Sequence, residues 1–249
     1  MFASLVVDDG EPTPEPPAQP ERCVGIDVGI LKYVHDSDGF AVGSLDLSDE
    51  QERLEREQRN LSRKERGSNN WQRQRREVAK CHLRMKRKRR DFLHRLSNYY
   101  ATEYDLVAVE DLNIAGMMQF GSNSRNRASA AWGTFLRMLG YKCEHEGTHF
   151  VPVNPMGTTK ECAQCGVETS KPIWVHEHSC PVCGFEADRN ANAAYNVLAR
   201  GLEDVGVVHP EGTPVETALP TSIHSVDAKR VIDPGSPALN GASAQARAE

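Results

Sequence analysis

Two Cys-x-x-Cys-Gly sequences, fourteen residues apart, constrain this chain more than any other feature. The pairs are Cys162/Cys165 and Cys180/Cys183, and the glycine after each pair permits a tight turn in which backbone amides point at the sulfurs. Four thiolates at this spacing bind one tetrahedral zinc ion in a closed site that stabilises the fold and carries out no chemistry. We therefore expect a zinc ribbon over residues 158–186, with Cys162, Cys165, Cys180 and Cys183 as the ligands.

The remaining cysteines and the apolar runs argue against a disulfide-bonded secreted protein and against a membrane protein. His176 and His178 are alternative ligands, but four thiolates already complete a zinc site, and Cys23, Cys81 and Cys143 are expected to be buried thiols. Seven cysteines, an odd number, argue against a disulfide framework. No apolar run approaches the roughly 20 residues that a membrane span requires. The N-terminus lacks the pattern of a secretory signal, so we expect a cytoplasmic protein without membrane contact.

The formal net charge of −5 conceals a basic segment. Residues 49–104 contain 17 lysines and arginines against 9 aspartates and glutamates, whereas the rest of the chain has 13 against 26. A basic segment of this kind is a candidate surface for phosphate backbones, and the alternative is a solvated helical face.

The apolar pattern predicts an α/β fold. Apolar, β-branched runs predict an antiparallel meander over residues 23–29, 32–35 and 40–42, followed by strands at 105–109 and 149–153. Helices are expected over residues 49–66, 71–104, 127–140 and 190–200, with Asn70 capping the second and Gly140 and Gly201 ending the last two. The run from Phe2 to Val7 is a candidate strand, five prolines make residues 11–20 a linker, and residues 202–249 are expected to be disordered.

Two carboxylates follow or interrupt apolar strands. Asp27 lies within Gly25-Ile26-Asp27-Val28-Gly29, and Glu110 follows the strand that begins at residue 105. With a carboxylate from a late helix they would hold two Mg²⁺ or Mn²⁺ ions for phosphodiester hydrolysis. Taken singly, Asp27 could cap a turn and Glu110 could pair with an arginine. Sugar kinases and actin-like ATPases also begin with such a strand, but they need phosphate-binding Thr, Ser or Gly where this chain has Ile30 and Leu31.

Five stretches carry a resemblance to a known family: VGIDVGILKYVHDSDG, SRKERGSNNWQRQRREVAK, VAVEDLNIAGM, NPMGTTKECAQCG and CPVCGFEADRNANAAYNVL. They resemble the OrfB/TnpB proteins of insertion sequences, the transposon-encoded relatives of type V CRISPR effectors. The resemblance implies an RNase H-like (RuvC) nuclease domain with a mixed sheet over residues 22–201. A basic helical hairpin at 49–104 and the zinc ribbon would interrupt it. Family members are RNA-guided DNA endonucleases with a guide RNA from the transposon end, and the resemblance makes Asp27 and Glu110 catalytic.

The sequence departs from the family in two places. The third family motif reads Asp-Arg-Asp-x-Asn-Ala-Ala, and its second aspartate corresponds to Asn190 here. Asp188 is a substitute only if the helix begins later than residue 190, because positions i and i+2 do not share a helical face. Residues 1–21 replace the longer N-terminal portion of full-length relatives, so we expect recognition of the target-flanking motif to be absent.

The basic helices fit the same family. The expected phosphate contacts are Arg73, Arg75, Arg76, Lys86, Arg87, Lys88, Arg89 and Arg90. Three hypotheses follow: a family nuclease with residual or full activity, a catalytically inactive nucleic-acid-binding relic, and a zinc-ribbon adaptor without nuclease activity.

Overall fold

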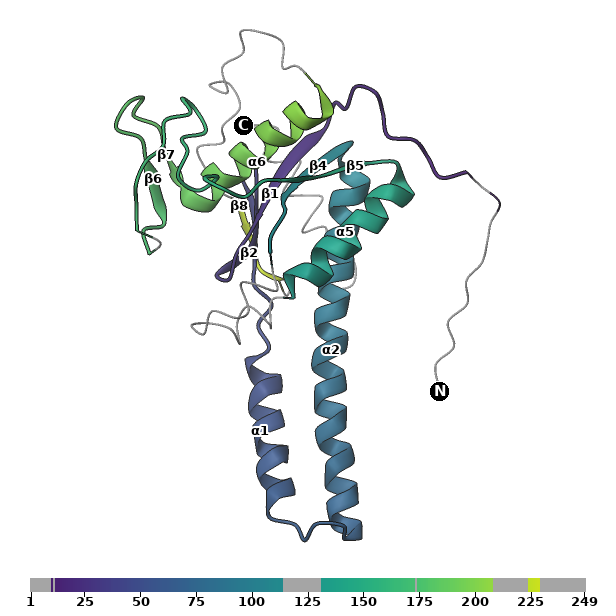
Figure 1. Cartoon of the computed structure of the whole chain (residues 1–249). Coiled ribbons are helices and arrows are strands. Elements are labelled where there is room, and N and C mark those ends of the chain that lie inside the picture. The colour runs from purple at the N-terminus through teal and green to yellow at the C-terminus, as the bar shows by residue number, and fades with distance from the viewer. Residues whose placement is uncertain (1–9, 11, 114–130, 173, 208–223, 229–249) are drawn as a thin grey trace.

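The computed structural model describes residues 10, 12–113, 131–172, 174–207 and 224–228 (Figure 1). No helix in these ranges is both long enough and apolar enough to cross a membrane. The candidate strand from Phe2 to Val7 lies outside them. The part of the linker within them, residues 12–20, contains no helix or strand, as predicted.

A six-stranded mixed sheet forms the centre of the molecule, with the order β5-β4-β1-β2-β3-β8. The predicted meander is confirmed, because β1 pairs antiparallel with β2 and β2 antiparallel with β3. β4 and β5 add to β1 in parallel. The strands are β1 Cys23–Val28, β2 Lys32–Asp36, β3 Phe40–Gly43, β4 Leu106–Glu110, β5 His149–Val153 and β8 His224–Val226.

Strand β8 corrects the expectation that residues 202–249 are disordered. It pairs in parallel with β3, and Ala228 just after it is buried. A three-residue strand has little pattern of its own, so only its pairing with β3 identifies it. Residues 208–223 and 229–249 lie outside the described ranges.

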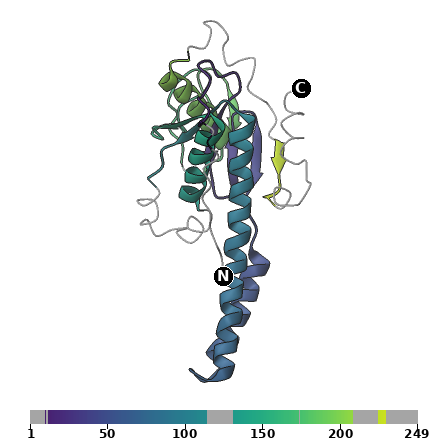
Figure 2. The same ribbon diagram turned by 90° about the vertical axis from the view of Figure 1, so that its right-hand side faces the viewer.

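A helical hairpin, α1 Ser48–Ser62 and α2 Asn69–Glu103, connects β3 to β4. Ser68 caps α2 by accepting a hydrogen bond from the Trp71 N–H at 3.1 Å, so the predicted Asn70 cap is wrong. Apart from Cys81, the buried residues of α2 begin at Phe92, and α1 has none. The hairpin therefore extends from the sheet as an arm, as both views show (Figures 1 and 2).

Helices cover both faces of the sheet. The C-terminal half of α2 and α5 Trp132–Glu146 pack with Val107 and Val109 on one face. Helix α6 Arg189–Val205 packs with Leu106 and Ala108 on the other. Because successive side chains of a strand alternate between faces, Glu110 belongs to the α6 face. Asp27 joins it, two residues after Gly25, which lies against α6.

Two glycines were wrongly predicted to end helices. Helix α6 continues through Gly201 to Val205 and stops at Gly206, whose φ is 73°. A Cβ on Gly201 would lie 2.4 Å from the Ala108 Cβ, so this glycine allows the helix to approach β4 closely. In the same way, α5 continues through Gly140 and stops at Gly147.

Candidate functional site

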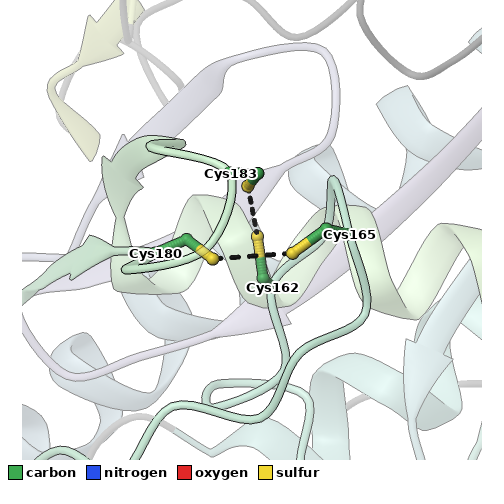
Figure 3. Close-up of side chains that lie close together, drawn as sticks. All are labelled: Cys162, Cys165, Cys180 and Cys183. Atoms are coloured by element: carbon green, nitrogen blue, oxygen red, sulfur yellow. Dashed lines mark hydrogen bonds between the residues drawn. The ribbon is translucent and has the colours of Figure 1, made fainter.

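The four cysteines of the predicted ribbon come together as one group (Figure 3). Their sulfurs all lie within 4.8 Å of one another, with Cys162–Cys183 at 3.6 Å and Cys165–Cys180 at 3.5 Å. A tetrahedral ion with Zn–S bonds of about 2.3 Å separates its sulfurs by about 3.8 Å. The group is therefore of the size that one zinc ion requires.

The two knuckles have the same backbone. Gly166 N–H donates to the Cys162 carbonyl at 2.8 Å, and Gly184 N–H donates to the Cys180 carbonyl at 3.0 Å. Both glycines adopt the left-handed conformation, with φ of 72° and 76°. The N–H groups of Cys183 and Val182 lower the pKa of Cys180 to about 6 by hydrogen bonding to its sulfur. The backbone thus stabilises a thiolate at this position.

The ribbon contains the hairpin β6 Glu177–Ser179 and β7 Glu186–Asp188. His178, one of the two alternative ligands, is fully buried, and its Nδ1 lies 2.9 Å from the Lys171 Nζ. It does not belong to the metal-holding group, and neither does His176. Of the three other cysteines, Cys81 and Cys143 are buried as predicted, while Cys23 is only partly buried.

Asp27 and Glu110 lie side by side at the ends of two parallel strands. β1 and β4 pair in the register Ile26↔Val109, so the next residue of each strand is a carboxylate on the α6 face. Asp27 is only 6% exposed and Glu110 only 8%. Burial raises the pKa of Asp27 well above its ordinary value, and the charges of Glu110 and Asp188 add to this, while that of Arg189 opposes it. Burial also raises the pKa of Glu110.

Asp188 reaches the same site from outside the helix. It is the last residue of β7 and the N-cap of α6, where its Oδ1 accepts hydrogen bonds from the N–H groups of Asn190 at 2.8 Å and Ala191 at 3.4 Å. Helix α6 begins at Arg189, earlier than predicted, so the condition stated for Asp188 as a substitute is not met. Asp188 is nevertheless outside the helix as its N-cap, and the rule for positions i and i+2 within a helix does not apply to it. Its negative charge helps to raise the pKa of Asp27.

Asn190 also approaches the end of β1. Its Nδ2 lies 3.8 Å from the position that a Cβ on Gly29 would occupy. Within the described residues, only the four cysteines bring three or more ligand atoms of His, Cys, Asp or Glu within 4.8 Å of one another. Asp27, Glu110 and Asp188 do not form so compact a trio.

His35 belongs to this site although it was not predicted. It is directly opposite Asp27 in the β1–β2 pair, it is buried, and its Nε2 lies 3.7 Å from the Asp188 Oδ1. Burial lowers the pKa of His35, although the charge of Asp188 opposes this shift. The predicted pairing of residues 23–29 with 32–35 was the signal that could have found it, because it places His35 in the strand next to Asp27.

The predicted phosphate contacts lie along α2, which has eleven basic against three acidic side chains. Lys88 forms a salt bridge with Glu50 of α1, and the guanidinium of Arg75 lies 5.7 Å from the centre of the Trp71 ring. Lys88 and Arg89 are partly buried, whereas the others are exposed: Arg73, Arg75, Arg76, Lys86, Arg87 and Arg90. Most of the predicted set thus faces solvent on the arm.

Two family models match the chain in succession. One, OrfB_IS605, carries the description "Probable transposase" and matches residues 4–121. The other, "Cas12f1-like, TNB domain", matches residues 132–197. A Streptomyces pristinaespiralis protein named "Putative RNA-guided DNA endonuclease" is 37% identical over 81% of this chain and 50% of its own length. The Escherichia coli K12 protein of the same name with the suffix InsQ is 31% identical over 80% of this chain and 54% of its own.

Solved structures show the same fold. A Cas12f1–sgRNA–target DNA complex aligns with a TM-score of 0.52 at 17% identity, covering 76% of this chain and 51% of that one. The likeness, with the mixed sheet and the four-cysteine group, defines a protein of the Cas12f1 fold class. The two family models and the two named relatives show that the chain belongs to the OrfB/TnpB family of insertion-sequence proteins. The chain spans about half the length of these curated relatives.

Proposed function

We propose that this chain acts as an RNA-guided, metal-dependent DNA endonuclease with an RNase H-like (RuvC) sheet and one structural zinc ion on Cys162, Cys165, Cys180 and Cys183. One observation carries the proposal: Asp27 and Glu110 are buried side by side on the α6 face. Two carboxylates buried together repel each other and lose hydration, so the arrangement favours a bound cation. The proposed partners are a guide RNA and a target DNA, because the names of the relatives and of the matching complexes mention both.

The residues present fit Mg²⁺ or Mn²⁺, because oxygen ligands suit hard cations. Asp27 and Glu110 would hold the metal, with Asp188 as the third carboxylate within reach. A metal bound there would activate water and neutralise the phosphate that is cleaved. Asn190 offers a carbonyl oxygen but no charge, so we propose that cleavage is slow. Asn190 also favours the second candidate function, a protein that binds guide and target without cutting.

Divalent cations are expected to stabilise the wild-type chain through the Asp27–Glu110 pair. At a free Mn²⁺ concentration a hundred times the dissociation constant, the gain in the free energy of unfolding is about 2.7 kcal/mol. Asp27→Asn removes one of two neighbouring buried charges, so this variant should be more stable than wild type without Mn²⁺ and gain nothing with it. Thermal unfolding with and without MnCl₂ measures both effects.

Asp204→Asn is the matched control, because Asp204 is an exposed aspartate on α6. This variant should retain the full stabilisation by Mn²⁺. If Mn²⁺ stabilises Asp27→Asn as much as it stabilises the wild type, the cation binds elsewhere and the proposed metal site is wrong.

Binding to single-stranded DNA is expected to weaken steeply with salt. Each phosphate contact contributes about 0.7 to the slope of log affinity against log salt. Replacing Arg73, Arg75 and Arg76 with Gln should therefore reduce the slope by about 2. Fluorescence anisotropy of a labelled oligonucleotide measures it, with Arg137→Gln on α5, outside the arm, as the control. A salt-independent affinity would argue against phosphate contacts, and no affinity at all would favour the zinc-ribbon adaptor.

A further inference from the structure

Thr158 connects the zinc ribbon to Glu110. It is buried at 1% exposure, and its Oγ1 lies 2.6 Å from the Glu110 Oε1 and 3.1 Å from the Pro155 carbonyl. A hydroxyl has one proton to donate, and the carboxylate is both the nearer and the stronger acceptor. Thr158 therefore donates to Glu110, and this hydrogen bond opposes the rise in the pKa of Glu110 that burial causes.

Two asparagines of α6 hold the backbone of Thr158. The Nδ2 of Asn192 lies 3.3 Å and that of Asn196 lies 2.8 Å from the Thr158 carbonyl. The same two amides donate to the Glu161 carbonyl, at 2.7 and 2.8 Å. Because Asn192 and Asn196 are four residues apart, they lie on one face of the helix, and together they fix residues 158–161 against α6.

Asn192 also bonds to the first zinc knuckle. Its Oδ1 accepts the N–H of Ala163 at 3.0 Å, and Ala163 lies between Cys162 and Cys165. Arg200 fixes the same segment through a salt bridge of 2.7 Å to Glu161 and a hydrogen bond of 2.9 Å to the Met156 carbonyl. An unbroken set of contacts therefore runs from the cysteines through Asn192 and Thr158 to Glu110.

We infer that Thr158 is a positioning residue for Glu110, and that Asn192 and Asn196 make this position depend on the zinc-bound ribbon. The inference rests on the proposed role of Glu110 as a metal ligand. A hydrogen bond to one carboxylate oxygen fixes the rotation of the group, and such support for a ligating side chain is worth about 10- to 100-fold in metal affinity. The zinc ion then serves the nuclease site as well as the stability of the ribbon.

The test compares Thr158→Val with Thr158→Ser in the zinc-loaded full chain. Valine has the shape of threonine without the hydroxyl, and serine retains the hydroxyl. Titration with Mn²⁺, followed by the electron paramagnetic resonance of the free ion, gives the dissociation constant. Thr158→Val should weaken Mn²⁺ binding by about 10- to 100-fold, and Thr158→Ser should restore it. Thermal unfolding midpoints identify any loss that is due to misfolding.

Equal Mn²⁺ affinity of Thr158→Val and wild type would overturn the positioning role, and so would equal losses in the Val and Ser variants. Asp27→Asn separates this failure from that of the proposed function. If Asp27→Asn abolishes Mn²⁺ binding and Thr158→Val does not change it, only the positioning role fails. If Asp27→Asn leaves Mn²⁺ binding unchanged, or the wild type binds none, the proposed metal site fails and the positioning role with it.

The dependence on zinc is tested with Cys165→Ser, which removes one thiolate of the ribbon. Its affinity for Mn²⁺ should fall as that of Thr158→Val does, although Asp27 and Glu110 are unchanged. A variant that combines Thr158→Val with Cys165→Ser should lose no more Mn²⁺ affinity than either single variant, because coupled residues give non-additive effects. Full Mn²⁺ affinity in Cys165→Ser, or strictly additive losses in the double variant, would overturn the link between the ribbon and Glu110.

Discussion

Replacing Asn190 with aspartate is expected to raise the rate of DNA cleavage by about two to three powers of ten. A unit charge about 4 Å from another contributes about 4 kcal/mol at the effective dielectric constant of a protein site. A loss of about 1.4 kcal/mol in transition-state stabilisation is a factor of ten in rate. Asn190 lies close to Gly29, two residues after Asp27, so an aspartate there would add its charge near the proposed cation site.

The measurement is cleavage of single-stranded DNA that contains the target, with a candidate guide RNA and Mg²⁺. Asn190→Ala is the control, since it alters the same side chain and adds no charge. Equal cleavage by wild type and Asn190→Asp would contradict the prediction and assign the third ligand to Asp188. Asp188→Asn then tests whether Asp188 is the third ligand. Asparagine is as good an N-cap as aspartate, so the start of α6 is retained.

The parts of this fold that were predicted correctly depend on residues close together in the sequence. Cysteine spacing and the glycines after each pair predicted the metal group, because both are properties of short turns. Apolar, β-branched runs predicted the meander and β4. The Asp27–Glu110 pair followed from strands that end at one edge of a parallel sheet, and the register of β1 and β4 bears this out.

The parts that were missed depend on contacts between distant segments. Gly201 was predicted to end a helix because glycine often does, but its role is set by Ala108 of β4. Strand β8 is defined by its pairing with β3. Asp188 is an exception, because it carried a local signal: an aspartate directly before a helix predicts an N-cap.

Thr158 and the two asparagines illustrate the same limit at the site. Each is an ordinary polar residue in the sequence, and Thr158 is 48 residues from Glu110. Their importance comes from burial, since a buried amide must form its hydrogen bonds within the protein. The sequence alone contained no measure of that burial.

The stability of the fold is expected to fall as the pH rises from about 4 to about 8, because of Asp36. This residue is the last of β2 and is 1% exposed. Its Oδ1 accepts the Phe40 N–H at 2.8 Å, and its Oδ2 lies 2.9 Å from the Tyr100 hydroxyl of α2. Burial, with the nearby charge of Asp38, raises the pKa of Asp36 from 3.8 to about 8.

The direction in which stability changes with pH follows from proton binding. Between these two pKa values the folded chain retains a proton on Asp36 that the unfolded chain has lost. The contribution of Asp36 is therefore complete below about pH 4 and falls by about 1.4 kcal/mol for each pH unit until the pH passes about 8. Asp36→Asn imitates the protonated carboxyl group, since its amide accepts from Phe40 and donates to Tyr100. This variant should match wild type in acid and exceed it in free energy of unfolding at alkaline pH.

Urea unfolding of both chains across this pH range measures the difference, in which the contributions of Asp27 and Glu110 cancel because both chains contain them. Asp204→Asn, at an exposed position on α6, is the control and should follow the wild-type curve. Parallel curves for wild type and Asp36→Asn would mean that Asp36 is ionised in the folded chain. The Tyr100 hydroxyl would then donate to a buried carboxylate, and the contact between α2 and the β2–β3 turn would be charged at neutral pH.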